Sequence, residues 1–184
     1  MRALRRKLTR AERDKAALRA ATLFLRQRKL ARSQRVAVYL ATGAELDPVP
    51  LTDALLRAGR AVFVPKLPRT GRMQLVRLRA SSPLRRGRHG IDFPVDHAPR
   101  TLLRQLDLIV LPLLAFDNEG RRLGSGGASY DRRLAARRAF RRPLLVGYAY
   151  SQQGVARVPE ENWDQRLDAV VTDEGVVWFK GRRQ

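Results

Sequence analysis

The sequence predicts a single α/β domain with a mostly parallel β-sheet covered by helices on both faces. Short apolar runs alternate along the chain with longer amphipathic stretches, which is typical of alternating strands and helices. Most of these runs are apolar at successive positions, as in strands that are buried on both faces. Hydrophobic residues make up 44% of the 184 residues, enough for a folded core. We therefore expect one domain over residues 1–184, with three layers.

The first predicted element is a long basic helix that packs on the domain. Thr9 and Glu12 form a Ser/Thr-x-x-Glu capping box, which marks a helix N-terminus. Apolar residues then recur at helical spacing up to Leu25. The pattern predicts one helix over residues 10–31 within an N-terminal segment, 1–31, that lies against the sheet.

The later elements follow from the same patterns. A second helix is predicted over residues 49–58, where Gly59 ends it. A third helix is expected over residues 127–140. Residues 80–100 hold three prolines and both histidines, so we expect an irregular segment there. The predicted strands are 36–40, 61–65, 73–79, 107–112, 144–150, 168–172 and, as an edge strand, 176–179.

The charge of the chain favours anionic partners. The formal net charge is +21, and residues 1–35 carry 13 basic and two acidic side chains. Arginine accounts for 33 of the 38 basic residues, however, which is equally typical of a GC-rich coding bias and a solvated helix face. Charge alone leaves nucleic acid, nucleotides and polyanionic substrates open as partners.

Several classes of protein are excluded or disfavoured. The longest apolar runs are too short to span a membrane, and no signal peptide is recognisable. The chain has no cysteine, which excludes disulfides and thiolate metal sites and makes the cytoplasm the expected compartment. His89 and His97 match neither a Ser-His-Asp triad nor a His-Glu-x-x-His metal motif.

The loops that follow the predicted strands hold the candidate site. In parallel sheets, ligands bind outside the carboxyl ends of the strands. These loops carry Glu45, Asp47, Asp117 and Asp164, each of which could equally be a surface acid, a cap or a turn residue. Polar groups therefore converge on one edge of the predicted sheet.

The loop "LPLLAFDNEGRRLGSGGASYDRR" (111–133) is the strongest candidate for a phosphate site. Gly124, Gly126 and Gly127 allow close backbone approach, and their N–H groups could form an anion-binding concavity. Arg121 and Arg122 could add bidentate phosphate contacts. Neither the dinucleotide-binding nor the P-loop glycine motif is matched, so an ordinary glycine-rich turn remains an alternative.

Four blocks of sequence resemble the 5-formyltetrahydrofolate cyclo-ligase family, also called 5,10-methenyltetrahydrofolate synthetase. They are "RRKLTRAER", "VAVYLATGAELDP", "LDLIVLPLLAFDNEGRRLGSGGASYDR" and "VPEENWDQRLDAVVTDEG", in the order the family has them. Ala128 and Ser129 stand where the family usually has a glycine and an aromatic residue. The resemblance implies a Rossmann-like three-layer fold and an ATP-dependent ligase that closes the ring of 5-formyltetrahydrofolate.

The resemblance also implies the site residues. Leu40 and Glu45 would contact the folate, which can carry a polyglutamate tail, and Arg122 and Tyr130 would serve catalysis. Asp131 and Asp164 would hold Mg²⁺. The expected ATP-binding residues are Arg122, Leu123, Gly124, Ser125, Gly126, Gly127, Ala128, Ser129 and Tyr130.

Some expectations go beyond these blocks. Arg2, Arg5 and Arg6 precede the capping box, where they could reach the ATP phosphates. We expect a monomer or homodimer, with no membrane partner and no nucleic-acid partner. A weakly active folate-binding homologue and a basic nucleic-acid-associated domain remain as alternatives. The glycine-rich turn, Glu45 and Asp164 favour the enzyme, and the Arg-rich first helix favours these binding-protein alternatives.

Overall fold

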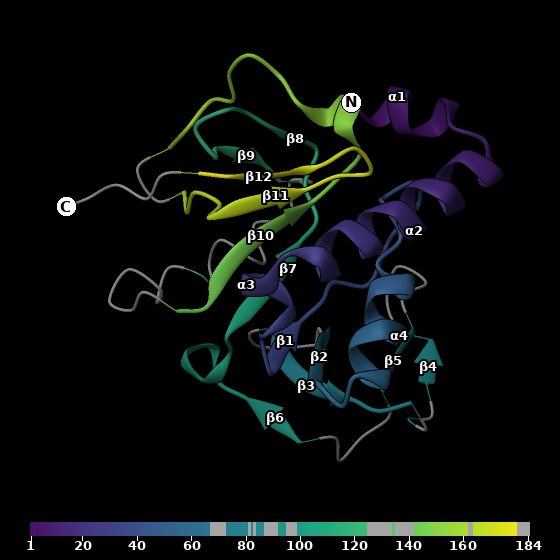
Figure 1. The fold of residues 1–184 in the computed structure, drawn as a ribbon, viewed down its shortest axis with the longest axis vertical. Coiled ribbons are helices and arrows are strands. Elements are labelled where there is room, and N and C mark those ends of the chain that lie inside the picture. Colours follow the sequence, from purple (N-terminus) through teal and green to yellow (C-terminus); the bar gives the residue numbers. More distant parts are fainter. Residues whose placement is uncertain are drawn as a thin grey trace.

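The fold is known from a computed structural model of the chain. It describes residues 1–66, 73–80, 82, 84–86, 92–94, 99–124, 134, 142–161 and 164–179. The helices are α1 (Arg2–Lys7), α2 (Arg10–Arg26), α3 (Arg28–Ala31) and α4 (Val49–Arg57), with 3₁₀ turns at Leu103–Gln105 and Ser151–Gln153. Figure 1 shows α2 crossing the sheet diagonally, with α4 beside it.

One large sheet organises the described part of the chain. Its strands follow the order β12-β11-β10-β7-β1-β2-β3-β6. Their bounds are β1 (Arg35–Ala37), β2 (Ala61–Lys66), β3 (Gln74–Leu78), β6 (Arg100–Thr101), β7 (Leu108–Leu111), β10 (Leu144–Tyr148), β11 (Ala169–Val171) and β12 (Val176–Trp178). The five central strands are parallel, and β12, β3 and β6 are antiparallel at the edges. This mixed, mostly parallel sheet confirms the predicted α/β class.

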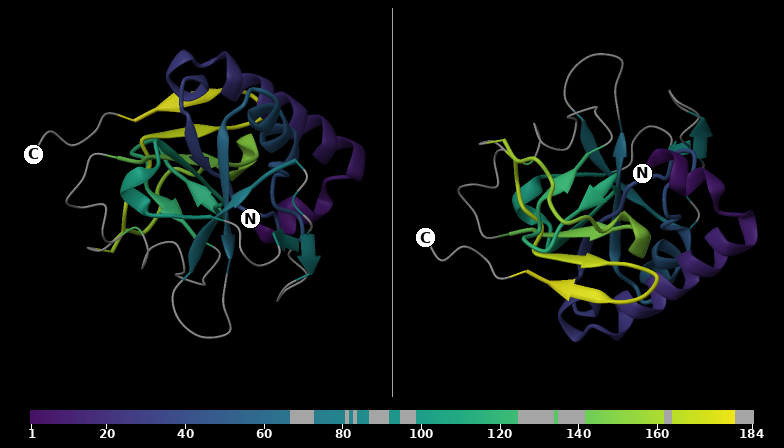
Figure 2. Two further views of the ribbon diagram at one scale, coloured as in Figure 1. Left: turned by 90° about the horizontal axis from the view of Figure 1, so that it is seen from below. Right: turned by 90° about the horizontal axis from the view of Figure 1, so that it is seen from above.

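Two hydrophobic clusters lie on the two faces of the sheet. The first packs α2 and α4 against the sheet, and Figure 2 shows α2 along that face. Phe24 and Leu51 are fully buried in this cluster. The second cluster contains Phe63, Ile109 and Leu134. Apart from Leu134, the predicted helix 127–140 lies outside the described residues.

The predicted helix 10–31 is interrupted in the structure. The capping box is confirmed, because the Thr9 hydroxyl accepts the Glu12 N–H and the Glu12 carboxylate accepts the Thr9 N–H. Helix α2 nevertheless ends at Arg26, and Gln27 is extended. Phe24 and Leu30 are both fully buried. Six residues of continuous helix would place them about 120° apart around the helix axis, so the break at Gln27 lets both side chains reach the core.

The described residues of the segment 80–100 include strands that the sequence did not predict. They form a short antiparallel pair, β4 (Leu84–Arg86) with β5 (Asp92–Pro94), and the start of β6. The period-2 pattern is too short there to signal strands. Helix α1 was not predicted either, because it is only six residues long and has no side-chain cap that would mark its N-terminus. No helix within the described residues is long and apolar enough to cross a membrane.

Candidate active site at the carboxyl edge of the sheet

The loops after β1, β7, β10 and β11 meet at one edge of the sheet, as the parallel pattern predicts. Tyr150, after β10, donates its hydroxyl to the Glu45 carbonyl at 3.5 Å. Gln153 donates its side-chain N–H to the Leu113 carbonyl at 2.7 Å. The Ser151 N–H donates to Asp173 Oδ1 at 2.8 Å. Hydrogen bonds thus join the four loops directly.

The loop after β1 holds the two predicted folate contacts. Leu40 and Glu45 are both partly exposed, so both remain accessible at this edge. Glu45 closes a tight turn: its N–H donates to the Thr42 carbonyl at 3.2 Å, and its Oε2 accepts the Thr42 N–H at 2.9 Å. Gly43 makes the turn possible with a φ of 59°. The Glu45 carboxylate therefore has a defined orientation in this turn.

The loop after β7 begins the predicted ATP site. Strands β8 (Ala115–Phe116) and β9 (Arg122–Leu123) form a short antiparallel pair. The Leu114 N–H donates to the Leu123 carbonyl at 2.7 Å. Arg122 is buried, Leu123 is exposed and Gly124 is half-buried. The remaining expected residues, Ser125–Tyr130 with Asp131, lie outside the described residues, so their ATP and metal roles stay predictions.

Arg121 does not fit its expected phosphate role. Its guanidinium contacts three carboxylates: Asp117 at 3.1 Å, Glu160 at 3.1 Å and Glu119 at 2.5 Å. Hydrogen bonds to Asp117 and Glu160 raise the pKa of Arg121. Since a guanidinium already shared by three acids has little capacity for a phosphate, we assign Arg121 a structural role.

Asp117 is the buried centre of this ion-pair network. Its carboxylate accepts the N–H groups of Glu119, Arg121 and Val158, besides the Arg121 guanidinium. Burial alone would raise the pKa of Asp117, but these hydrogen bonds outweigh it and lower the pKa. Arg166 completes the network by pairing with Glu160 at 2.5 Å and Glu119 at 3.4 Å. We call Asp117, Glu119, Arg121, Glu160 and Arg166 the acid–arginine clamp, which ties the β8–β9 hairpin to the segment 158–166.

Asp164, the other predicted metal ligand, lies in that clamped segment. Its N–H donates to the Glu161 carbonyl, and its Oδ2 accepts the Glu161 N–H, both at 2.9 Å. Within the described part of the chain, no hydrogen bond uses its Oδ1. No group of three acidic or imidazole side chains is gathered for a metal among the described residues. Asp164 therefore has a carboxylate oxygen to offer, while its proposed partner Asp131 lies outside the described residues.

Of the three N-terminal arginines that could reach the ATP phosphates, Arg2, Arg5 and Arg6, only Arg5 is buried at this edge. Arg5 is 7% exposed, and its guanidinium donates to the Leu113 carbonyl at 3.4 Å. Arg2 and Arg6 are exposed. Figure 1 shows α1 at the same upper end of the molecule as the turn Ser151–Gln153, which follows β10. The N-terminal helix is thus held at the carboxyl edge by one buried arginine.

Comparison with known proteins agrees with the geometry. Residues 1–173 match the model of the 5-formyltetrahydrofolate cyclo-ligase family. The Escherichia coli (strain K12) 5-formyltetrahydrofolate cyclo-ligase is 37% identical over 175 residues, covering 94% of this chain and 96% of that protein. The Haemophilus influenzae cyclo-ligase is 33% identical, covering 73% of each chain.

Solved structures extend this agreement to the fold. The NMR structure of Aquifex aeolicus 5,10-methenyltetrahydrofolate synthetase has a TM-score of 0.84 and 31% identity, covering 99% of this chain and 90% of that chain. The Mycoplasma pneumoniae synthetase, at 20% identity, shares the fold with a TM-score of 0.72. This chain belongs to the 5-formyltetrahydrofolate cyclo-ligase family and is an enzyme of the ligase class.

Proposed function

We propose that the protein converts 5-formyltetrahydrofolate to 5,10-methenyltetrahydrofolate, using ATP and Mg²⁺ and releasing ADP and phosphate. The observation that carries the proposal is the meeting of two loops at one sheet edge in a chain of this family. The Glu45 loop and the strand that begins the predicted ATP segment are joined there through Tyr150 and Gln153.

The reaction needs an activated oxygen. The formyl oxygen attacks the γ-phosphorus of ATP and ADP leaves, which gives an iminophosphate. N10 then attacks the formyl carbon and loses its proton, and the C–O bond breaks as phosphate departs. Phosphate is a good leaving group whereas a formamide oxygen is not, so the protein's task is positioning and charge stabilisation.

The chain's residues divide between the two substrates in this proposal. Glu45 accepts hydrogen bonds from the N–H groups of the reduced pterin, with Leu40 packed against the ring. The segment Arg122–Tyr130 holds ATP, with Arg122 and Tyr130 beside the transferred phosphoryl group. Asp131 and Asp164 hold Mg²⁺, which supplies positive charge beside the triphosphate. A folate with a polyglutamate tail is included, since the protein is basic.

The test is absorbance in the methenyl product's band. Product should form only with 5-formyltetrahydrofolate, ATP and Mg²⁺ together. Glu45→Gln should raise the KM for folate more than the KM for ATP, by about five- to 150-fold for a lost buried contact of about 1–3 kcal/mol. Asp131→Asn should weaken Mg·ATP binding in calorimetry while the protein stays folded. No product from wild-type protein that binds both substrates would contradict the proposal.

A further inference from the structure

Three buried tyrosines stand at the ends of β1 and β10, and each donates its hydroxyl to a backbone carbonyl. Tyr39 and Tyr148 are 2% and 1% exposed, and Tyr150 is 1% exposed. Tyr39 bonds the Leu46 carbonyl, Tyr150 the Glu45 carbonyl and Tyr148 the Ala17 carbonyl. The first two bonds go to the Glu45 loop, and the third goes to helix α2.

Two neighbouring carbonyls of the Glu45 loop are therefore held by hydroxyls from two different strands. Tyr39 follows β1, on the same chain segment as the loop. Tyr150 follows β10, which is separated from β1 in the sheet by β7. A tyrosine hydroxyl is protonated at neutral pH and can donate, and burial raises the pKa of Tyr150 further, to about 12. Tyr150 is thus a cross-sheet contact to the residue expected to bind folate.

Tyr150 is itself placed by Gln153. The Tyr150 N–H donates to Gln153 Oε1 at 2.9 Å. The amide nitrogen of Gln153 donates to the carbonyls of Leu113 and Leu114, at 2.7 Å and 3.1 Å. Gln153 is 1% exposed, and its bonds to Tyr150 and Leu113 are buried. The Leu114 N–H continues the chain of bonds to Leu123, beside Arg122.

We propose that Tyr150 and Gln153 are positioning residues that set the Glu45 loop and the Arg122 strand relative to each other. Tyr150 fixes the backbone of Glu45, and Gln153 fixes both Tyr150 and the start of the β8–β9 hairpin. Neither residue needs to touch a substrate. The proposal rests on the proposed function in one respect: Glu45 contacts the folate and Arg122 the nucleotide.

The first test is Tyr150→Phe with Tyr148→Phe as its matched control. Both variants remove one buried hydroxyl that donates to a backbone carbonyl, but only Tyr150→Phe releases the Glu45 loop. We expect Tyr150→Phe to raise the KM for folate about two- to tenfold, as for one neutral hydrogen bond, with the KM for ATP unchanged. Tyr148→Phe should leave both KM values unchanged. Equal folate KM values in the two variants would overturn the role of Tyr150.

Hydrogen exchange gives a readout that needs no substrate. Amides 42–46 should exchange faster in Tyr150→Phe than in wild type, and at the wild-type rate in Tyr148→Phe. Exchange that is unchanged in Tyr150→Phe would overturn the positioning role even if turnover were altered. Amides 42–46 could exchange faster only in Tyr150→Phe while the wild-type protein forms no methenyl product. That result would support the positioning role and contradict the proposed function.

The link through Gln153 is tested by Gln153→Met, which keeps the length of the side chain and removes its hydrogen bonds. We expect both KM values to rise, because the Glu45 loop and the β8–β9 hairpin lose their shared partner. In the double variant Tyr150→Phe/Gln153→Met, the folate KM should rise less than the product of the two single effects. Multiplicative effects would show independent residues and overturn the link.

Discussion

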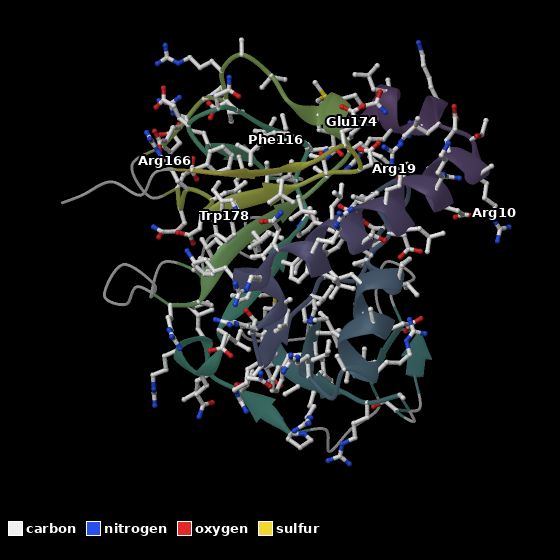
Figure 3. The ribbon with its side chains drawn as sticks, viewed as in Figure 1. Arg10, Arg19, Phe116, Arg166, Glu174 and Trp178 are labelled. Atoms are coloured by element: carbon white, nitrogen blue, oxygen red, sulfur yellow. The ribbon has the colours of Figure 1, made fainter. Side chains whose placement is uncertain are left out.

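The two loops of the candidate site are held by opposite kinds of interaction. The Glu45 loop is fixed by neutral hydroxyls of buried tyrosines, Tyr39 and Tyr150. The β8–β9 hairpin is fixed by the acid–arginine clamp, which is partly exposed. Figure 3 shows the clamp residue Arg166 on the opposite side of the molecule from Arg10 in helix α2. Neutral bonds in the interior respond little to salt or acid, whereas ion pairs respond to both. The side of the site that we propose binds the nucleotide should therefore be the side that acid loosens first.

The largest expected effect is the loss of the clamp's centre. Asp117→Ala leaves three backbone N–H groups without their acceptor and removes one of the three carboxylates around the Arg121 guanidinium. It should therefore lower the free energy of unfolding by about 3–5 kcal/mol. The matched control is Asp14→Ala, since Asp14 also pairs with an arginine four residues away but is exposed. That change should cost about 0.5 kcal/mol or less. Urea unfolding measures both, and similar losses would contradict a buried centre.

Each of the two loops contains a glycine with positive φ, and the two glycines differ in how much space surrounds them. Gly120, between the clamp residues Glu119 and Arg121, has a φ of 77°, and an added Cβ would lie 2.9 Å from both the Leu167 carbonyl oxygen and the Phe179 ring. Gly43 in the Glu45 loop has a φ of 59° with open space around it. Gly43→Ala should cost about 1–2 kcal/mol from backbone strain alone. Gly120→Ala adds a steric clash to the backbone strain and should cost about 2–4 kcal/mol. Thermal unfolding measures the loss of stability in both variants, and equal losses would contradict the predicted clash at Gly120.

Acid should weaken the clamp before the tyrosine contacts. The hydrogen bond from Arg166 lowers the pKa of Glu160 to about 2, and the pKa of Asp117 is lowered too. A depressed carboxyl pKa contributes stability that is complete above the unfolded value of about 4.5 and is lost as pH falls toward about 2. We expect unfolding free energy to fall across that range, and to fall less steeply in Glu160→Gln. If the unfolding free energy of Glu160→Gln fell with pH as steeply as that of the wild type, the contribution assigned to Glu160 would be contradicted.

The tyrosines should show the opposite dependence. Burial raises the pKa of Tyr150 to about 12, above the ordinary value of 10. The folded state therefore favours the protonated hydroxyl, and its contribution to stability is complete below about pH 10 and is lost as pH rises toward 12. Near-ultraviolet tyrosinate absorbance should show Tyr150→Phe removing one late-titrating group. A titration unchanged by the substitution would contradict this.

The smallest effect should come from the basic helix. Arg19, Arg26 and Arg32 are exposed, so we expect their replacement by Gln to change stability by less than about 0.5 kcal/mol and to leave turnover unchanged. Tight RNA or DNA binding at physiological salt that disappears in the triple variant would instead support the nucleic-acid alternative.

The sheet could be predicted from sequence because its strands are buried on both faces. Runs such as "LDLIVLP" and "LLVGYAY" are best accommodated in the interior of a folded domain. The alternating run 73–79 was correctly predicted as a strand, and the structure shows that this strand, β3, is antiparallel to β2. Helix α1 could not be predicted, since its position depends on the burial of Arg5 against Leu113, a contact 108 residues away in the chain. Local patterns carry no information on such contacts.

The meeting of the loops at one edge of the sheet could be predicted from sequence, but the different roles of adjacent residues in them could not. Arg121 and Arg122 look equivalent in sequence, yet Arg121 is held by acids and Arg122 is buried in β9. The acids at Asp117 and Glu119, four and two residues before Arg121, were the available signal. Tyr39 and Tyr150 were interpreted only as strand residues, although a buried tyrosine hydroxyl needs a partner.

The most direct test of the two-sided site is the pair of KM values measured by methenyl absorbance in Tyr150→Phe and Arg121→Gln, under conditions where both variants are fully folded. We expect a different KM to rise in each variant. Tyr150→Phe should raise the KM for folate, whereas Arg121→Gln, which loosens the hairpin that contains Arg122, should raise the KM for ATP. A rise in the same KM for both variants, or in neither, would contradict the division of the site into a folate side and a nucleotide side.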